Sequence, residues 1–406
     1  MCSVNGPSTT RFRSRPPRDP QAARAQHRAK YLNRAVQPFE PHSLPLNELD
    51  WRQLLPLVGQ ANAALARYDG LLAGIPNAAV MLSPLTTQEA VLSSRIEGTQ
   101  ATVDEVLEQE AGLFKEGEKF NDIQEISNYR TALFQARDHL KHYPIRLGFV
   151  RELHRTLMSS VRGQDKTPGE FRLKQNWIGR EGCTIDQATF VPPNPVQLHD
   201  HLEAWAKYLD SDDVDFLIQT AVVHAQFELL HPFMDGNGRI GRILIPLFLF
   251  QKKVLSQPMF YLSEYLESHR DEYYARLTGI SAVCDWDSWI AFFLRAIAEQ
   301  ATQNAKRVVA IRALYDEMKA RIQATTRSQY TVHLLDAIFS KPIFSTSELA
   351  DRLSAEDGIH EKTASALLRQ LRDAGILREL KAGSGRRAAT MCFPQLINLA
   401  EGRTVL

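Results

Sequence analysis

The sequence has no apolar stretch long enough to cross a membrane. Its longest uninterrupted apolar run, Ile243–Phe250 with its proline included, has eight residues, whereas a membrane-spanning helix needs roughly 20. The first residues also lack the charged start and apolar centre of a secretory signal. We therefore expect a cytoplasmic protein that makes no contact with a membrane.

Cysteine is scarce, with four residues in 406, and no two of them form a C-x-x-C pair. A disulfide framework or a zinc site of the usual spacing is therefore not expected, and the thiols fit a reducing compartment. The four cysteines are Cys2, Cys183, Cys284 and Cys392.

An excess of charge of either sign is absent too. The chain has 48 Lys and Arg residues and 47 Asp and Glu residues, which gives a net charge of +1. This balance excludes a protein whose whole surface is built for polyanions, so any contact with nucleic acid must be local. The apolar fraction of 44% is ordinary for globular proteins. At roughly 150 residues per domain, the length predicts two or three domains.

Composition and hydrophobic periodicity divide the chain into six segments. Residues 1–39 contain seven arginines, one lysine and one acidic residue, and five prolines interrupt any helix there. We expect a flexible basic leader. The later segments mostly show the spacing of amphipathic helices, so the predicted fold is all-α. The segments are the leader (1–43), a helical N-terminal region (44–121), a core (122–304), a connecting helix (305–327), a second domain (328–394) and a tail (395–406).

Two parts of the core interrupt the helical pattern. Between Arg162 and Pro195, glycines surround the alternating stretch Gln175–Gly179, which predicts a surface β-hairpin. Further on, a helix predicted over Val214–Leu230 leads into a polar loop, and the apolar run Ile240–Phe250 resumes helical structure. A polar loop is thus expected between two buried helices.

A further helix is predicted before the core. Thr86 and Glu89 have the spacing of a capping box, and a glycine follows residue 97, so the helix is expected over about residues 86–97. Ser93 and Glu97, four positions apart, then lie on one face of this helix.

The second domain is predicted as three short helices followed by two strands, an order that resembles a winged helix-turn-helix domain. Its positive residues suit DNA phosphates, whereas neighbouring acidic residues weaken that positive face. DNA binding and a protein-interaction or packing role both stay open. The helices are Val332–Phe339, Leu349–Leu353 and Glu361–Ala374, the strands are Ile376–Lys381 and Arg386–Phe393, and the positive residues are Lys362, Arg369, Arg372, Arg378, Lys381, Arg386 and Arg387.

The polar loop carries the strongest chemical signal. From His231 the chain reads His-Pro-Phe-Met-Asp-Gly-Asn-Gly-Arg-Ile-Gly-Arg. Gly236 and Gly238 let the backbone approach an anion at the start of a helix, where successive N–H groups point outward. Arg239 and Arg242, three positions apart, place two guanidinium groups on the same side. This arrangement predicts a cradle for phosphate groups.

Two side chains of the loop suit catalysis beside such a cradle. Asp235 is placed to hold Mg²⁺ against phosphates, because carboxylate oxygen is a preferred ligand of this ion. His231 is left to take up a proton, and an unperturbed pKa of about 6.5 suits a general base at neutral pH.

The twelve residues His231–Arg242 resemble the signature of the Fic domain family, His-Pro-Phe-x-(Asp/Glu)-Gly-Asn-Gly-Arg-x-x-Arg, without a departure. The resemblance implies an enzyme of the nucleotidyltransferase class, a protein adenylyltransferase. Such an enzyme transfers AMP from ATP to a Ser, Thr or Tyr hydroxyl of a target protein and releases pyrophosphate.

The same resemblance implies a role for each residue of the loop. His231 would be the general base and Asp235 the Mg²⁺ ligand, while Phe233 would anchor the loop in the core. Asn237 and the backbone of Gly236–Arg239 would cradle the phosphates, with Gly238 and Arg239 among the ATP-binding residues. The second arginine, Arg242, would hold the γ-phosphate.

The predicted hairpin resembles the flap with which Fic domains hold a target by strand addition. The residues implied at this flap are Asn176, Trp177 and Ile178, and Ile178 and Gly179 are also implied beside ATP. Packing is an equally open role for Trp177.

Tyr273 and Tyr274 resemble the tyrosine pair that lies near the nucleotide base in the family. Some relatives carry an asparagine seven residues after the pair, where this chain has Ser281. One contact on the adenine side is therefore not implied by the resemblance.

The stretch Ser93–Gly98 resembles the family's inhibitory helix pattern, (Ser/Thr)-x-x-x-Glu-(Gly/Asn). The residues implied in inhibition are Ser93, Glu97 and Gly98. Glu97 would pair with Arg242 and keep the γ-phosphate of ATP out of its productive position, which places Glu97 in the ATP site as well. In some relatives this glutamate also positions water for the removal of AMP, so de-AMPylation stays open.

Other interpretations remain beside the enzyme. His224 lies seven residues before His231 on the same helical face, and with Asp235 it could indicate a His/Asp metal site for hydrolysis. A different class of protein is a nucleotide-sensing, DNA-binding transcriptional regulator, which should tolerate the loss of His231. The expected partners are ATP and a target protein, and family habit suggests a homodimer.

Overall fold

A computed structural model describes residues 37–404 of the chain, except 76, 112–118, 160–165, 181 and 385–387. This part is mostly helical, which confirms the all-α prediction. The helices before the C-terminal block are α2 (Trp51–Ala73), α3 (Ala78–Met81), α4 (Ser83–Ile96), α5 (Val103–Glu110), α6 (Phe120–His139), α7 (Leu147–Leu157), α8 (Pro195–Asp210), α9 (Phe216–Leu230), α10 (Asn237–Gln251), α11 (Ser263–Ser268), α12 (Arg270–Val283) and α13 (Trp286–Thr326), with a 3₁₀ turn η2 at Ile185–Gln187.

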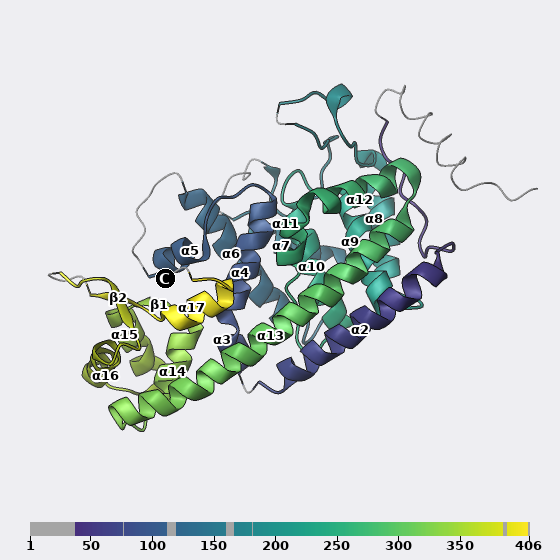
Figure 1. Ribbon diagram of the computed structural model, residues 1–406. Helices are drawn as coiled ribbons and strands as arrows, with labels where there is room; N and C mark the ends of the chain where they lie inside the picture. The colour runs from purple at the N-terminus through teal and green to yellow at the C-terminus, as the bar shows by residue number, and fades with distance from the viewer. Residues whose placement is uncertain are drawn as a thin grey trace, which may run out of the picture.

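Helix α13 runs diagonally across the molecule, with α2 packed along it (Figure 1). It spans 41 residues and contains neither glycine nor proline. Its buried face continues past residue 304 through Val308, Ile311 and Met318. The boundary predicted between a core and a connecting helix at residues 304 and 305 therefore does not correspond to the end of any helix.

Helices α9 and α10 form the centre of the helical body, and nearly all their side chains are buried. Asp215 caps α9 by accepting hydrogen bonds from the N–H groups of Leu217 and Ile218, at 2.8 and 3.1 Å. Trp289 of α13 packs against α9 and donates its indole N–H to the carbonyl of Ala221 at 2.9 Å. The loop of residues 231–236 thus joins two buried helices, as the sequence pattern predicts.

Helix α4 begins at Ser83, earlier than predicted, because Pro84 suits the first turn of a helix. The predicted capping box of Thr86 and Glu89 is wrong. The hydroxyl of Thr86 hydrogen-bonds to that of Tyr261 at 2.7 Å. The carboxylate of Glu89 accepts hydrogen bonds from the hydroxyl and the backbone N–H of Ser263, at 2.6 and 3.1 Å. Both side chains therefore join α4 to the segment around the start of α11.

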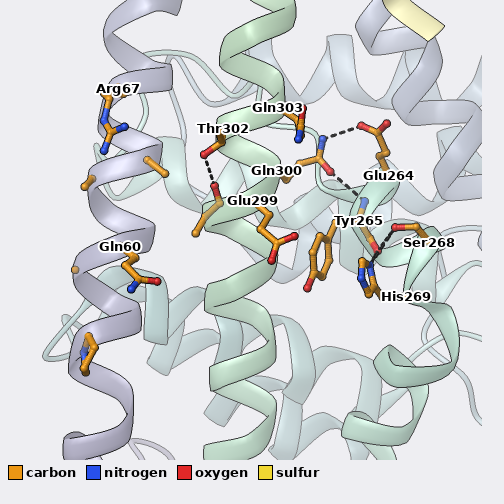
Figure 2. Close-up of a pocket in the computed structure, with 15 residues that line it drawn as sticks. Gln60, Arg67, Glu264, Tyr265, Ser268, His269, Glu299, Gln300, Thr302 and Gln303 are labelled. Atoms are coloured by element: carbon orange, nitrogen blue, oxygen red, sulfur yellow. Dashed lines mark hydrogen bonds between the residues drawn. The ribbon is translucent and has the colours of Figure 1, made fainter. Parts of the chain in front are cut away.

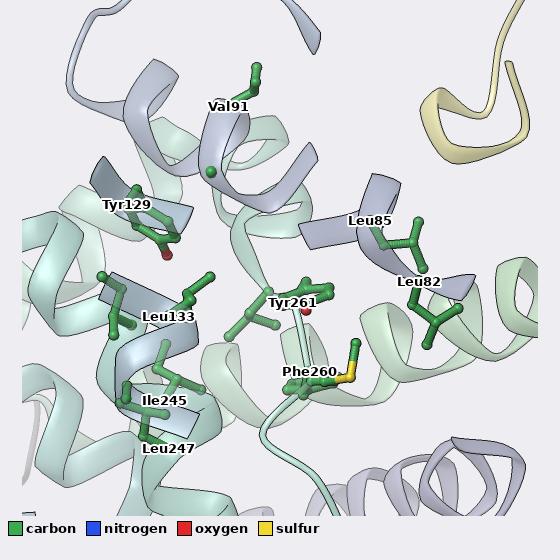
Figure 3. Packing of buried hydrophobic residues seen from close by; sticks show 14 of the residues in the cluster. Leu82, Leu85, Val91, Tyr129, Leu133, Ile245, Leu247, Phe260 and Tyr261 are labelled. Carbon is green, nitrogen blue, oxygen red and sulfur yellow. The ribbon is translucent and has the colours of Figure 1, made fainter. Parts of the chain in front are cut away.

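The apolar face of α4 is part of the main core. Figure 3 shows Leu85 and Val91 of α4, Tyr129 and Leu133 of α6 and Ile245 of α10 in one buried cluster. All five side chains are buried. Burial on this scale makes α4 an integral helix of the body.

The C-terminal block combines helices with a small sheet. The sheet has the strand order β1–β3–β2, and both neighbouring pairs are antiparallel. Phe344 of β1 and Glu379 of β2 lie opposite the same residue of β3, Met391. The elements are α14 (Thr331–Ser340), β1 (Ile343–Ser345), α15 (Thr346–Asp357), α16 (Glu361–Asp373), β2 (Arg378–Lys381), β3 (Thr390–Cys392) and α17 (Pro394–Glu401).

Two of these elements are absent from the sequence prediction. Strand β1 has three residues, too few for an alternating pattern to be recognised. Helix α17 lies where the prediction places a tail, and its Leu396 and Ile397 are fully buried. It packs against α13 and α4, so this part of the chain belongs to the fold.

The two predicted strands begin later than expected, at Arg378 and at Thr390. The N–H groups of residues 376 and 377 still bond to the carbonyl of Leu371 in α16, which delays the first strand. Arg386 and Arg387, predicted near the turn, lie outside the described residues.

The predicted leader is too long at its C-terminal end. Residues 37–43 pack on the helical body. The N–H of Phe39 donates to the carbonyl of Val191 at 2.9 Å. The ring of Phe39 also lies 5.7 Å from that of Phe190, centroid to centroid. Residues 1–36, the rest of the predicted leader, lie outside the described residues.

A hollow of about 890 Å³ opens between α2, α11 and α13. Figure 2 shows Arg67 of α2 on one side of it and the stacked rings of Tyr265 and His269 on the other. None of the residues predicted for the functional site lines it. Among the described residues, no helix is both long and apolar enough to span a membrane.

Candidate functional site

The loop between α9 and α10 turns through two residues in the left-handed region of the backbone. Gly236 has a φ of 76°, which glycine adopts without steric cost, and it directly precedes α10. His231 has a φ of 46°, which is unusual for a residue with a side chain. Arg172, itself buried, donates from Nε to the carbonyl of His231 at 2.9 Å. This bond helps to hold the histidine in its left-handed conformation.

Asn237 closes the loop on itself. Its Oδ1 accepts a hydrogen bond from the N–H of Phe233 at 2.8 Å, and its Nδ2 donates to the carbonyl of Phe233 at 2.9 Å. The side chain is 2% exposed and both its polar ends are engaged. Any phosphate contact at this position therefore falls to the backbone, while the side chain holds the shape of the loop.

His154 of α7 supports the loop from outside. Its Nε2 lies 2.9 Å from the carbonyl of Asp235, and its Nδ1 accepts the N–H of Gly169 at 2.8 Å, so the proton is on Nε2. Its ring stacks on that of Phe233 with a centroid distance of 3.8 Å. Burial is the main cause that lowers the pKa of His154 to about 4. The neutral ring can keep this pair of bonds throughout the physiological range.

The ring of His231 is poised to accept a proton. Its Nδ1 lies 3.4 Å from the carbonyl of Glu228, which can only accept, so the proton is on Nδ1. Among the described residues, Nε2 has no hydrogen-bond partner. Burial, more than any charge nearby, lowers the pKa of His231 to about 4. The imidazole is therefore neutral at pH 7, with the lone pair of Nε2 available.

The start of α10 presents backbone N–H groups beside this histidine, because the first N–H groups of a helix have no partner within it. A Cβ at Gly238 would lie 2.2 Å from Oε1 of Glu97 and 3.0 Å from Nη1 of Arg242. A side chain at position 238 would therefore displace the carboxylate of Glu97 or the guanidinium of Arg242. Glu97 lies where the helix terminus favours an anion.

Arg242 is the most enclosed cation of the site, with 1% of its side chain exposed. It donates to Oε1 of Glu97 at 2.6 Å. It also donates to the hydroxyl of Ser93 at 2.8 Å and to the carbonyl of Ser93 at 3.0 Å. Both partners come from the last turn and the end of α4. Gly98 follows them with a φ of 101°, which lets the chain leave the helix.

The carboxylate of Glu97 is ionised in this pair. Burial acts to raise its pKa, but attraction to Arg242 and the hydrogen bond between them outweigh burial, and the pKa is lowered. About a third of the Glu97 side chain, 35%, remains exposed. The pair therefore lies at the edge of the site, with the arginine inside and the glutamate at the opening.

Arg239 is engaged from the other side. It donates to Glu125 of α6 at 2.8 Å, and 5% and 6% of the two side chains are exposed. It lies 3.5 Å from Oδ1 of Asp235 as well. Arg239 is therefore held in place beside the loop, where its charge still acts on an anion at the start of α10.

Asp235 fits the role of a magnesium ligand. Its Oδ1 accepts the N–H of Gly236 at 2.6 Å, and 46% of its side chain is exposed at the loop. A single carboxylate suits Mg²⁺, which is commonly held by one or two carboxylates together with phosphates of a substrate and water. The residues present are thus compatible with this ion.

The two tyrosines of α12 differ in their surroundings. Tyr273 is buried, and its hydroxyl lies 3.0 Å from Nε2 of His224. Tyr274 is 40% exposed and lies under the guanidinium of Arg270, which is 5.8 Å from its ring centre. Only Tyr274 therefore offers a ring surface to a ligand. Ser281, further along the helix, is partly exposed and donates to the carbonyl of Thr278 in the same helix at 3.0 Å.

The alternative of a His/Asp metal site is not supported. His224 uses Nδ1 for the carbonyl of Gly241 at 3.1 Å and Nε2 for Tyr273. Burial is the first cause that lowers its pKa to about 3. Within the described ranges there is no group of three His, Cys, Asp or Glu residues able to hold a metal. His224 is a core residue that ties α9 to α10 and α12.

The predicted hairpin is reduced to a single antiparallel bridge between Ile178 and Phe190. A longer ladder cannot form, because Pro192 and Pro193 have no N–H to donate. A Cβ at Gly179 would lie 2.6 Å from Sγ of Cys183, so a side chain at position 179 would displace this sulfur. The predicted flap is therefore a short loop with one pair of bridge bonds.

Of the three predicted target-binding residues of the flap, one is buried and two are exposed. Asn176 is buried and donates to the carbonyl of Phe233 at 3.0 Å, so it helps to hold the loop of residues 231–236 in place. Trp177 and Ile178 are 42% and 41% exposed. The indole N–H of Trp177 donates to the carbonyl of Cys183 at 3.0 Å, which fixes the ring on the flap. Two apolar side chains thus face outward next to the loop of His231.

Comparison with known protein families finds matches in three parts of the chain. Residues 55–138 match the Fic/DOC family N-terminal region, and residues 144–249 match the Fic/DOC family itself. The chain thus contains a Fic/DOC domain, and it is called the Fic protein below. Residues 314–387 of this Fic protein match the C-terminal domain of SoFic-like protein adenylyltransferases.

Curated relatives match parts of the Fic protein. A probable protein adenylyltransferase of Aquifex aeolicus (strain VF5) is 27% identical over 192 residues, which cover 47% of this chain and 56% of the relative. Protein adenylyltransferase Fic of Drosophila erecta is 30% identical over 105 residues, 25% of this chain and 19% of that protein. The chain thus spans little more than half of the bacterial relative and about a fifth of the insect one.

A solved structure supports the fold. A Fic family protein from Desulfovibrio desulfuricans G20 superposes with a TM-score of 0.51 at 19% identity, covering 88% of this chain and 98% of that one. At this identity the similarity concerns the fold alone.

Three residues of the Fic site escape a sequence interpretation. Arg172, His154 and Glu125 come from three separate places in the chain, and each supports a residue of the loop or of α10. Their spacing from the signature is irregular, so no local pattern connects them. The buried face of α7 could have singled out His154 as an inward residue, but not its partner.

Substitution of Asn237 by alanine should destabilise the protein by about 1–3 kcal/mol, because it leaves the buried N–H of Phe233 without a partner and the carbonyl of Phe233 with Asn176 as its remaining donor. The measurement is urea unfolding followed by fluorescence. The matched control is Asn77→Ala, since Asn77 is exposed and its side chain makes no capping bond. Equal stability of the two variants would contradict the role of Asn237 in closing the loop.

The buried carboxyl group of Glu228 should make the stability of the folded protein depend on pH. Burial is the main cause that raises its pKa to about 8 in the folded protein, and its Oε1 has no hydrogen-bond partner. The unfolded chain loses this proton near pH 4.5, so between that pH and about 8 the folded state keeps a proton that the unfolded state releases. Stability from this group is therefore lost as the pH rises.

The side chain of Glu228→Gln cannot ionise. The free energy of unfolding of this variant, relative to that of wild type, should therefore be higher at pH 8 than at pH 5. Urea unfolding at the two pH values measures this gain, with the exposed Glu361→Gln as control. A difference between variant and wild type that is the same at both pH values would refute the prediction.

Proposed function

We propose that this Fic protein is a protein adenylyltransferase that transfers AMP from ATP to a hydroxyl group of a target protein and is held inactive by Glu97. The observation that carries the proposal is the neutral His231, whose Nε2 has no partner among the described residues, beside the start of α10. The names of the relatives from Aquifex, a probable protein adenylyltransferase, and from Drosophila, a protein adenylyltransferase, support the same activity.

In the proposed reaction, Nε2 of His231 removes the proton from a Ser, Thr or Tyr hydroxyl. The hydroxyl oxygen forms a bond to the α-phosphorus of ATP, and the bond from that phosphorus to the oxygen bridging to the β-phosphate breaks. Pyrophosphate leaves with the electron pair of the broken bond. The first N–H groups of α10 and the charge of Arg239 stabilise the negative charge of the phosphates.

Asp235 would hold Mg²⁺ in this site, and the ion would neutralise charge on the phosphates of ATP. The exposed face of Tyr274 is suited to the base or sugar of the nucleotide. Arg242 would receive the γ-phosphate once Glu97 has moved. Ile178 and Gly179 lie on the flap and would close the nucleotide side of the site.

Inhibition follows from a competition between two anions for one cation. The bond from Arg242 to Glu97 is charge-assisted, a class of bond worth roughly 1.5–3 kcal/mol. While it persists, the γ-phosphate cannot take the same guanidinium. De-AMPylation with Glu97 in place would be a second activity of the same site, and the loss of label from a modified target would reveal it.

The target protein would dock at Asn176, Trp177 and Ile178 of the flap. We assign the reaction to the cytoplasm, where ATP is available and where Cys183, Cys284 and Cys392 remain thiols as they are here. A homodimer is part of the proposal only by analogy with the family.

We propose that the C-terminal block is a winged-helix domain, on the basis of the order of α14, α15 and α16 and the sheet β1–β3–β2. The positive charge on its surface is partly neutralised by acidic residues, which argues against DNA binding. Arg372 pairs with Asp373 at 2.8 Å and lies 3.6 Å from Glu379. These contacts favour a protein-interaction role over the nucleotide-sensing regulator, although Lys362 and Arg369 remain exposed.

The test is transfer of label from α-labelled ATP with Mg²⁺ to the protein itself and to lysate proteins. Glu97→Gly should raise labelling by about tenfold or more, because it removes a charge-assisted bond. Adding His231→Ala should lower labelling by about 10²–10⁴-fold, the usual contribution of a general base. Glu356→Gly, at an exposed glutamate of α15, is the control and should behave as wild type.

Absence of label in every variant, with ATP binding still measurable, would overturn the proposed transfer of AMP. Label that persists in the double variant would remove His231 from the role of base.

A further inference from the structure

Residues 37–43 form a strap, defined here by that range, that connects two distant parts of the Fic protein. Figure 1 shows the purple trace before α2 passing along the side of α8 and α12. Its contacts lie at two anchors, one on the flap and one at the junction of α12 and α13. The sequence prediction treats this range as part of a flexible leader, so its contacts need a separate explanation.

The first anchor holds the flap. The N–H of Phe39 donates to the carbonyl of Val191 at 2.9 Å, and its ring lies 5.7 Å from that of Phe190. Phe190 is the residue that bridges Ile178, through bonds of 2.9 Å from the N–H of Ile178 and 3.1 Å to its carbonyl. The strap is therefore joined to the flap through the only bridge that the flap has among the described residues.

The second anchor is His42. Its Nδ1 accepts the indole N–H of Trp286 at 3.1 Å, so the ring proton is on Nε2, which lies 3.0 Å from Sγ of Cys284. Gln226 of α9 donates to the carbonyl of His42 at 3.3 Å. The rings of Phe39 and His42 meet edge to face at 5.6 Å, so the two anchors support each other.

This arrangement leaves one edge of the flap open. Val191 is engaged by the strap and Ile178 by Phe190, whereas the backbone N–H groups of Trp177 and Gly179 have no partner among the described residues. An extended segment can add only on the side of Trp177 and Gly179. The strap occupies the opposite side, where it braces the short bridge from behind.

We propose that the strap is a positioning element for the flap, with Phe39 setting the place of the bridge and His42 fixing the strap to the body. The inference rests on the proposed function, in which the flap holds the target. A flap with a single bridge has little stability of its own, because an isolated pair of strands is at best marginal in water. Bracing by Phe39 then preorganises the edge to which the target adds, and affinity for the target depends on it.

The first test measures amide hydrogen exchange of the flap in the whole protein. Phe39→Ala should speed exchange at Ile178 and Phe190 by roughly tenfold, because the loss of the aromatic contact favours local opening. Phe39→Leu should recover much of the protection. Phe134→Ala is the matched control, since Phe134 is a partly exposed phenylalanine of α6.

Unchanged exchange at the flap in Phe39→Ala would overturn the proposal. So would an equal increase in α10, which would indicate general loss of stability instead of a local effect on the flap.

The second test uses the other anchor. His42→Ala should speed the labelling of Cys284 by a maleimide, located by peptide mass spectrometry, and should also speed exchange at the flap. Faster labelling of Cys284 without any change at the flap would show that the two anchors are independent and would refute the strap.

The third test links the strap to activity. In the Glu97→Gly background, Phe39→Ala should raise the KM for the labelled lysate protein several-fold and leave the kcat and the affinity for ATP nearly unchanged. Altered kcat with unchanged KM would contradict a positioning role. If flap exchange responds as expected but no variant transfers AMP, the strap stands and the proposed function fails.

Discussion

The burial of Arg242 is the constraint on which the site depends. A guanidinium removed from water has to be paired and hydrogen-bonded, and this one finds its partners in Ser93 and Glu97 of the α4 region. Helix α4 must therefore end across the start of α10. The carboxylate of Glu97 then fills the place where the helix terminus favours a phosphate, and a side chain at position 238 would displace this carboxylate. One ion pair thus links the end of α4 to the start of α10 and occupies the space next to Gly238.

The position of α4 depends in turn on contacts far from the loop. Glu89 joins it to Ser263, and burial, the main cause, raises the pKa of Glu89 to about 7. At the other end, the hydroxyl of Ser83 donates to the carbonyl of Ser340 in α14 at 2.9 Å, and α17 packs on the same helix. Helix α4, which leads into Glu97, consequently packs against both the Fic core and the C-terminal block. A change in either neighbour acts on the same short segment.

The signature from His231 to Arg242 could be predicted because its chemistry is contiguous in the sequence, and the spacing of Ser93 and Glu97 could be predicted for the same reason. The supports could not, because residues such as His154, Arg172 and Glu125 meet the loop only after folding. The fold was predictable in its helical character. It was not predictable in β1 and α17, which are short, or in the length of α13, whose polar positions hide a continuous buried face. The role of Asn237 depends on the folded loop, where both ends of its amide bind the backbone of Phe233.

The central claim is that Glu97 holds the cation that a terminal phosphate of the nucleotide would otherwise bind. Calorimetric affinities of ATP and ADP for wild type and Glu97→Gly test it most directly, because the two nucleotides differ by the γ-phosphate alone. The account predicts that the substitution strengthens binding of ATP more than binding of ADP, since Arg242 then becomes available to the γ-phosphate. An equal gain for both nucleotides, or no gain for either, would contradict it.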